Sequence, residues 1–129
     1  MITCLFTAMG VAAADYDNDG FPDLFVTGYP SCALLHNNGN GTFSDVTGKA
    51  GLANSGKWAA SAAWFDYDRD GWLDLIVCNY VRTSFTDSPR CEYAGLRTYC
   101  EQRAYEGMPL ALYHNNGNGT FTDVSVRSG

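Results

Sequence analysis

Two short acidic segments hold the residues of this 129-residue chain whose types and spacing are best suited to chemistry. Residues 15–23 have the sequence DYDNDGFPD, and residues 66–74 have the sequence DYDRDGWLD. Each segment has aspartate at positions 1, 3, 5 and 9 and glycine at position 6. Four carboxylates in one tight loop repel one another at neutral pH unless water or a cation lies between them. Because a glycine bend lets alternate side chains converge on one point, the spacing predicts a Ca²⁺ ion in each loop.

Each predicted Ca²⁺ site has five ligands, the four aspartates and the backbone carbonyl of position 7. The ligands of the first site are Asp15, Asp17, Asp19, Phe21 and Asp23. The ligands of the second site are Asp66, Asp68, Asp70, Trp72 and Asp74. An EF-hand is disfavoured because its position-12 glutamate is replaced by Val26 and Val77, and Mg²⁺ is disfavoured because it keeps its waters. We expect a structural role, since the metal engages every carboxylate and leaves none for acid–base catalysis.

Apolar stretches on both sides of each acidic segment predict the elements that position it. We expect two units of four strands, with the acidic loop between the first two strands and an NNGNG turn between the last two. The first unit spans residues 11–57, the second spans residues 58–129, and residues 1–10 form an N-terminal strand or arm. An insertion, residues 81–109, interrupts the second unit and is expected to form a surface loop.

The last strand of each unit is expected at residues 42–47 and 120–125. In the first of these strands Phe43 and Val46 are three residues apart, so simple alternation fails. A bulge or an early strand end is therefore needed there.

The composition is that of one ordinary globular domain, with 46% hydrophobic and 17% charged residues. The net charge is −6, and 8 of the 14 acidic residues lie in the two segments, so the acidity belongs mainly to the predicted metal sites. Eight Lys and Arg residues without a basic cluster argue against a nucleic-acid partner. No apolar run approaches the ~18–20 residues of a membrane-spanning helix. The first ten residues lack positive charge and are too short for a usual secretion signal.

Five cysteines leave an odd number after pairing. Cys91 and Cys100 flank a short polar stretch of the insertion, and we expect a disulfide between them because a Ca²⁺-dependent protein is usually extracellular. Cys78 lies within an apolar strand and is expected to be a small buried residue. Cys4 and Cys32 stay undecided, and a bond between them is one possibility.

The combined pattern, D-x-D-x-D-G-x-x-D followed by an apolar strand and then N-N-G-x-G-T-F-x-D-V, resembles the FG-GAP/VCBS repeat of integrin-α-type β-propellers. The resemblance covers most of residues 10–129, and the insertion ending in Tyr99-Cys100 is similar to that of secreted bacterial members. It implies blade-forming repeats with Ca²⁺ loops on one rim, and it assigns ligand roles to the eight aspartates. It supplies no enzymatic activity. The expected fold is all-β, two four-stranded antiparallel propeller-type blades that do not close a propeller, since closure needs at least about four blades.

Two units cannot bury both faces of each sheet, so we expect further blades or copies of the chain to assemble with them, as a ring, a filament or part of a longer protein. The apolar residues 1–9 could add a strand to a neighbouring sheet. The expected function is a calcium-stabilised, non-enzymatic structural or adhesion module at the cell surface or outside the cell. Two alternatives stay open: glycan or protein ligand binding through the insertion, and an accessory part of a secreted enzyme.

Other residues are weaker candidates for a functional role. His36 and His114 precede the NNG turns and are interpreted as strand-end surface residues, because no Cys, His or Glu lies at ligand spacing. Asn40 and Asn118 begin N-glycosylation sequons, although the turn explains them without sugar. The aromatic residues near the acidic segments are expected to pack between blades, with a sugar-binding platform as the alternative. They are Tyr16, Trp58, Trp64, Phe65, Tyr67 and Trp72.

Overall fold

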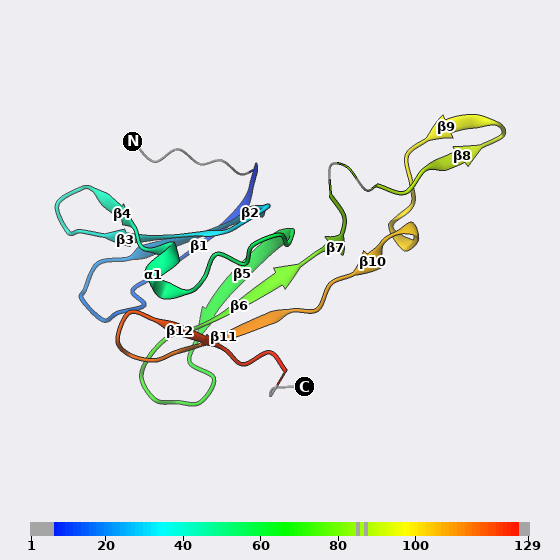
Figure 1. Ribbon diagram of the computed structural model, residues 1–129. Helices are drawn as coiled ribbons and strands as arrows, with labels where there is room; N and C mark the ends of the chain where they lie inside the picture. Colours follow the sequence, from blue (N-terminus) through cyan, green and yellow to red (C-terminus); the bar gives the residue numbers. More distant parts are fainter. Residues whose placement is uncertain (1–6, 85, 87, 127–129) are drawn as a thin grey trace.

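The computed structural model describes residues 7–84, 86 and 88–126. It contains two four-stranded antiparallel sheets that do not close into a propeller (Figure 1). The first sheet consists of β1 (Thr7–Ala14), β2 (Asp23–Tyr29), β3 (Ala33–Asn37) and β4 (Phe43–Asp45) in spatial order. The second consists of β5 (Ala59–Phe65), β6 (Asp74–Asn79), β11 (Ala111–Asn115) and β12 (Phe121–Asp123). The all-β fold predicted from the sequence, two open propeller-type blades, is confirmed.

The two sheets pack face to face and form one core between them. Phe25 and Leu34 of the first sheet and Leu75 and Val77 of the second have no exposed surface. Trp64 lies at the contact, since its ring centroid is 6.2 Å from that of Phe25. Burying this apolar surface holds the two blades together, at about 25 cal/mol for each Å² removed from water.

Strand β4 ends at Asp45, so the early strand end expected near Phe43 and Val46 is confirmed. The Asp45 carboxylate accepts hydrogen bonds from the backbone N–H and the hydroxyl of Thr47, and these bonds turn the chain out of the sheet. A one-turn helix, α1 (Thr47–Ala50), follows where the sequence predicted a loop.

Strand β12 stops in the same way as β4. Asp123 accepts hydrogen bonds from the backbone N–H and the hydroxyl of Ser125, so the strand is shorter than the predicted residues 120–125.

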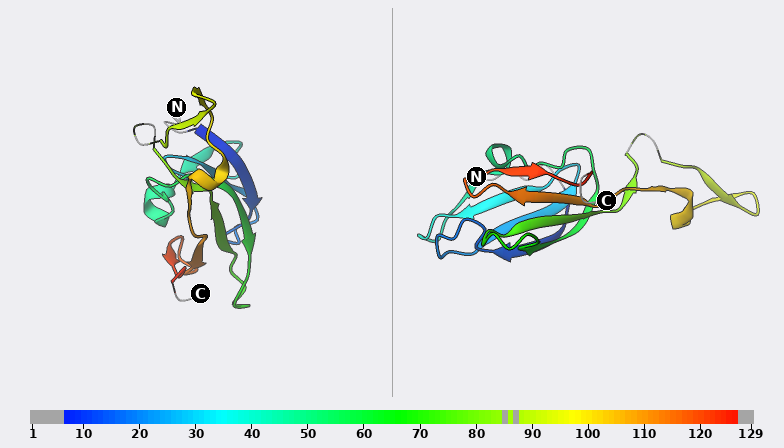
Figure 2. Two further views of the ribbon diagram at one scale, coloured as in Figure 1. Left: turned by 90° about the vertical axis from the view of Figure 1, so that its right-hand side faces the viewer. Right: turned by 90° about the horizontal axis from the view of Figure 1, so that it is seen from below.

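The insertion leaves the second sheet as an arm with its own short elements (Figure 2). Strand β7 (Val81–Arg82) pairs with β10 (Glu106–Gly107) at the root of the arm. Beyond them, β8 (Cys91–Tyr93) and β9 (Leu96–Thr98) form a hairpin, and a 3₁₀ helix, η1 (Gln102–Ala104), leads back. A disulfide joins Cys91 to Cys100, the pair named from the sequence. The insertion is thus an ordered structure with strands rather than only a loop.

Strand β1 already begins at Thr7, so residues 7–10 of the expected arm lie in the first sheet. The rest of that arm, including Cys4, lies outside the described residues. Among the described residues Cys32 is buried without a disulfide partner. Cys78 is also free, but it is partly exposed, and the expectation that it would be buried is wrong. In the described part of the chain, no helix is long and apolar enough to cross a membrane.

Candidate metal centre

Each acidic loop curls around its first aspartate. The two oxygens of Asp15 accept hydrogen bonds from the backbone N–H groups of Asp19, at 3.1 Å, and Gly20, at 2.9 Å. Asp66 accepts the equivalent bonds from Asp70, at 3.2 Å, and Gly71, at 3.1 Å. These bonds draw positions 1, 3 and 5 toward one point.

Positive φ angles make the curl possible. The glycines at position 6 have φ values of 91° and 89°, which residues with a side chain rarely adopt. Position 4 is also left-handed, with Asn18 at φ 59° and Arg69 at φ 64°. Asparagine tolerates this region better than arginine does, so the second loop is the more strained of the two.

The aspartate at position 9 fixes each loop to its sheet. Asp23 and Asp74 have no exposed surface. Asp23 accepts hydrogen bonds from the backbone N–H groups of Tyr16, at 3.3 Å, and Asn37, at 2.8 Å. The equivalent donors to Asp74 are the N–H groups of Tyr67 and Asn115, at 3.1 and 2.8 Å. A buried carboxylate therefore joins the loop to the third strand in both units.

The carboxylates converge as the spacing predicted. In each loop, ligand atoms of the aspartates at positions 1, 3 and 5 all lie within 4.8 Å of one another. These aspartates are Asp15, Asp17 and Asp19 in the first loop and Asp66, Asp68 and Asp70 in the second. The aspartate at position 9 comes equally close to the one at position 3.

The residues of the first loop fit a bound Ca²⁺ ion. One oxygen of Asp17, Oδ1, is buried and has no hydrogen-bond partner among the described residues. Burial, together with the charges of Asp23 and Asp19, raises the pKa of Asp17, and burial likewise raises the pKa of Asp23. A hard divalent cation would supply the partner that Asp17 Oδ1 lacks and a positive charge that both carboxylates would favour.

The two histidines lie near strand ends, as interpreted, but the structure places them against these clusters rather than simply on the surface. Nδ1 of His36 lies 3.1 Å from Asp23 and 3.3 Å from Asp17. Nδ1 of His114 lies 3.2 Å from Asp74 and 3.4 Å from Asp68. Both side chains are about one quarter exposed. A sequence signal for this contact did exist. Each histidine directly precedes the asparagine whose backbone N–H donates to the aspartate at position 9.

Position 7 and the NNGNG turn pack on one another. A Cβ atom added at Gly117 would lie 2.9 Å from the ring of Trp72, so glycine lets the turn approach that ring. The sequon residues Asn40 and Asn118 are exposed, and each accepts hydrogen bonds from the threonine two residues later. Turn chemistry thus accounts for both asparagines.

The two loops lie at the same end of the sheets and are linked to each other (Figure 1). The buried Asn115 donates from Nδ2 to the carbonyl of Tyr16, at 2.9 Å, and to that of Leu73, at 3.0 Å. Asn18 donates to the carbonyl of Gly71 at 3.3 Å. The second loop is therefore built partly on the first.

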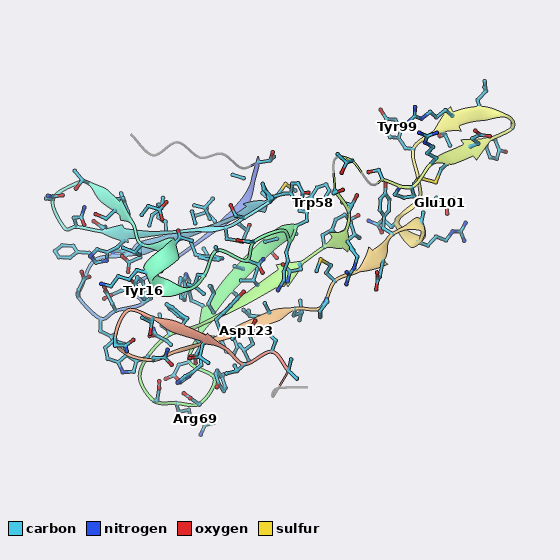
Figure 3. All side chains as sticks on the ribbon, in the orientation of Figure 1. Tyr16, Trp58, Arg69, Tyr99, Glu101 and Asp123 are labelled. Atoms are coloured by element: carbon cyan, nitrogen blue, oxygen red, sulfur yellow. A yellow bond between two sulfur atoms is a disulfide. The ribbon has the colours of Figure 1, made fainter. Side chains whose placement is uncertain are left out.

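The aromatic residues lie in different places. Tyr16 stacks against Trp64 between the sheets, and burial raises its pKa to about 12. Phe65 and Tyr67 are 38% and 42% exposed, so they do not pack between the described blades. Trp58 lies at the opposite end of the sheets, near the arm, and not at the loops as expected (Figure 3).

Comparison with known proteins agrees with this geometry. Residues 15–77 match the family described as FG-GAP-like repeat, and this stretch, which includes both acidic loops, is an FG-GAP-like repeat. The resemblance to FG-GAP repeats that the sequence suggested is confirmed over these residues. A 47-residue segment, 36% of this chain, is 38% identical to cartilage acidic protein 1 of Mus musculus. The match spans only 7% of the length of that relative.

Proposed function

We propose that this chain is a calcium-stabilised structural or adhesive module, without enzymatic activity, of an extracellular β-propeller-type assembly. It acts by packing its two blades against further blades, either of a longer protein or of other copies of the chain. One observation supports the proposal. The outward face of each sheet presents the same repeat positions that the other sheet buries where the two sheets pack together.

The outer face of the first sheet matches the face that the second sheet buries. The second sheet packs inward with Trp64, Leu75 and Tyr113, which are paired across β5, β6 and β11. The equivalent row of the first sheet is Ala13, Leu24 and Leu35. Because side chains alternate along a strand, this row points away from the partner sheet. Val11, which lies beside it, is 65% exposed.

The outer face of the second sheet likewise corresponds to the face that the first sheet buries. Its row is Ala63, Ile76 and Leu112, paired across the same strands. The corresponding row of the first sheet, Ala12, Phe25 and Leu34, is the one that packs inward. A further blade could therefore dock on either side by repeating the existing interface, which is a head-to-tail contact.

Calcium and an extracellular location rest on separate observations. The unpartnered oxygen of Asp17 and the converging carboxylates support Ca²⁺ in the loops. The disulfide between Cys91 and Cys100 supports an oxidising compartment. The match to a cartilage acidic protein agrees with that location.

Sedimentation velocity of the chain in millimolar Ca²⁺ tests the assembly. We expect species larger than the 14.0 kDa monomer. Val11→Glu blocks one outer face and Ile76→Glu blocks the other, so each variant alone should stay small. An equimolar mixture of the two should form dimers and nothing larger, because one intact face remains on each partner. Ser55→Glu, at an exposed turn, is the control that should assemble normally.

Two results would overturn the assembly. The first is a folded, monodisperse monomer of the unaltered chain in Ca²⁺. The second is continued growth of large species in the mixture of the two blocked variants, which a head-to-tail contact does not allow.

A further inference from the structure

A groove of about 550 Å³ lies at the end of the sheets opposite the acidic loops, where the arm begins. Four aromatic residues line it, Tyr29, Trp58, Tyr80 and Tyr105, and we call it the aromatic groove. The ring centroid of Trp58 is 5.8 Å from that of Tyr29 and 5.8 Å from that of Tyr80. Figure 3 shows Trp58 at the root of the arm. The groove is therefore separate from the metal centre.

The insertion builds one wall of the aromatic groove and fixes Tyr80. The amide of Gln102 donates to the Tyr80 hydroxyl at 2.9 Å, and the Tyr80 N–H donates to the carbonyl of Trp58 at 2.8 Å. An ion pair between Arg82 and Glu106, at 3.0 Å, supports the β7–β10 pair beside it. The first unit has Tyr29 at the position equivalent to Tyr80 but no insertion, so it has no such wall.

Charge limits what the aromatic groove can accept. None of the described residues that line it is charged, although the chain has 22 charged residues, 8 basic and 14 acidic, and a net charge of −6. A phosphate, a sulfate or a charged peptide would lose its hydration there without gaining an opposite charge. The groove is therefore better suited to an uncharged ligand.

The polar groups of the lining narrow the class of ligand further. The hydroxyl side chains of Thr7, Thr83 and Ser88 and the amide of Gln102 line the groove together with the aromatic rings and the apolar Met9 and Val81. Thr83 and Ser88 bond to each other at 3.3 Å, and Gln102 bonds to Tyr80. Each hydroxyl oxygen still has a spare lone pair, and the Gln102 amide has a second N–H and a carbonyl, which an apolar segment of protein would leave unused. A pyranose ring has apolar C–H faces that stack on aromatic rings and hydroxyl edges that exchange hydrogen bonds, so it matches both parts of the lining.

Tyr80 provides an accessible surface for stacking. Its side chain is 41% exposed even though its hydroxyl is held by Gln102. A ring that is fixed before binding loses little conformational freedom when a ligand stacks on it. We propose that the aromatic groove is a binding site for a neutral oligosaccharide, with one sugar ring stacked on Tyr80.

Fluorescence polarisation of end-labelled neutral oligosaccharides, built of glucose, mannose, xylose or N-acetylglucosamine, tests the site on the full chain in Ca²⁺. We expect at least one of them to bind. Tyr80→Ala should weaken that binding at least tenfold, as truncation of a stacked aromatic anchor typically does. Tyr80→Phe keeps the ring and should bind within a few-fold of the unaltered chain.

Tyr93→Ala is the matched control, because Tyr93 is 81% exposed on the β8–β9 hairpin and does not line the groove. It should leave binding unchanged. If Tyr80→Ala fails to fold by circular dichroism, Gln102→Lys replaces it: this exposed position would put a charge into the neutral groove and should weaken binding to the same extent.

Three results would overturn the site. One is that no oligosaccharide of the panel binds at millimolar concentration. Another is that Tyr93→Ala weakens binding as much as the groove variant does. The third is that Tyr80→Ala abolishes self-association in sedimentation, because a second copy of the chain would then be the occupant of the groove.

Discussion

At the scale of single residues, Asp17 is the group on which the proposed Ca²⁺ ion of the first loop would act most directly. Its ionised carboxylate has one buried oxygen without a partner among the described residues, and the carboxylates of Asp19 and Asp23 lie close to it. A raised pKa in the folded state means that ionising this group disfavours folding. A bound Ca²⁺ reverses the sign of that contribution, because the same charge then acts as a ligand.

Asp17→Asn should therefore change stability in opposite directions with and without Ca²⁺. In EDTA at pH 7 we expect the variant to be more stable than the unaltered chain, by about 1 kcal/mol, because it has no buried charge. In saturating Ca²⁺ it should be less stable, since it binds the ion at least tenfold more weakly, about 1.4 kcal/mol. Urea unfolding followed by tryptophan fluorescence measures both differences.

The stability difference between Asp17→Asn and the unaltered chain should also depend on pH. Because burial raises the pKa of Asp17, its contribution to stability is present below the unfolded pKa of about 3.9 and is lost as pH rises through the folded value. The higher free energy of unfolding of Asp17→Asn in EDTA should thus disappear as pH falls toward about 4. Glu92→Gln, on the arm, is a control that should show no such inversion. The same sign of effect with and without Ca²⁺ would contradict the metal assignment.

Arg69 should be a weak point of the second loop. It adopts the left-handed region at φ 64°, while Asn18 occupies the equivalent position at φ 59°. We expect Arg69→Asn to raise the free energy of unfolding in saturating Ca²⁺ by about 1 kcal/mol, because asparagine tolerates this conformation. Asn18→Arg is the matched reverse change and should lower it by a similar amount. Two changes of the same sign in chemical denaturation would exclude backbone strain as the cause.

The sequence was sufficient for the aspartates but not for the histidines. The 1-3-5-9 spacing is local, so it predicted which carboxylates converge. His36 is 13 residues from Asp23, and only the pairing of β2 with β3 brings them together. A ligand search by spacing along the chain could not find that contact, because it depends on strand register.

At the scale of elements, the arm depends on its own disulfide. Cys91 and Cys100 close the β8–β9 hairpin, whose exposed side chains include Tyr93 and Leu96, 81% and 73% exposed. Short strands with exposed apolar side chains contribute little to their own stability. We expect the double variant Cys91→Ser, Cys100→Ser to unfold the hairpin locally while leaving the two sheets intact.

Limited trypsin digestion measures that local unfolding. Cleavage after Arg90 and Arg97 should become several-fold faster or more in the double variant, whereas the melting temperature of the sheets should change by a few degrees at most. A large drop in melting temperature would show that the arm stabilises the sheets, which would contradict its description as a separate element.

Strands and turns were the most predictable elements. The repeated pattern of apolar runs, acidic loop and NNGNG turn indicated eight strands because each feature is set by a few neighbouring residues. The helix α1 and the elements of the arm were missed. Their formation depends on the side-chain bonds of Asp45 and on the pairing of β7 with β10, and neither gives a periodic signal. The aromatic groove was missed for a similar reason, since Tyr29 and Trp58 are brought together only by the folded sheets.

At the scale of the whole molecule, removing Ca²⁺ should destabilise both blades together. Each proposed site would contribute about 2.7 kcal/mol at a Ca²⁺ concentration 100-fold above its Kd. At roughly 3–6 °C per kcal/mol for a domain of this size, EDTA should lower the melting temperature by more than about 10 °C. Differential scanning calorimetry measures the shift, and an equal concentration of Mg²⁺ in place of Ca²⁺ is the control. An unchanged melting curve in EDTA would exclude a structural metal.

The hydrogen bond from Asn115 to the carbonyl of Tyr16 gives the molecule a direction. It runs from the turn of the later unit to the loop of the earlier one. The asparagine at the same position of the first unit is Asn37, which donates to the carbonyl of Pro22 within its own loop. If further blades repeat this bond, each added blade donates to the loop of the blade before it. Any array of such blades would therefore have one polarity and two chemically distinct ends.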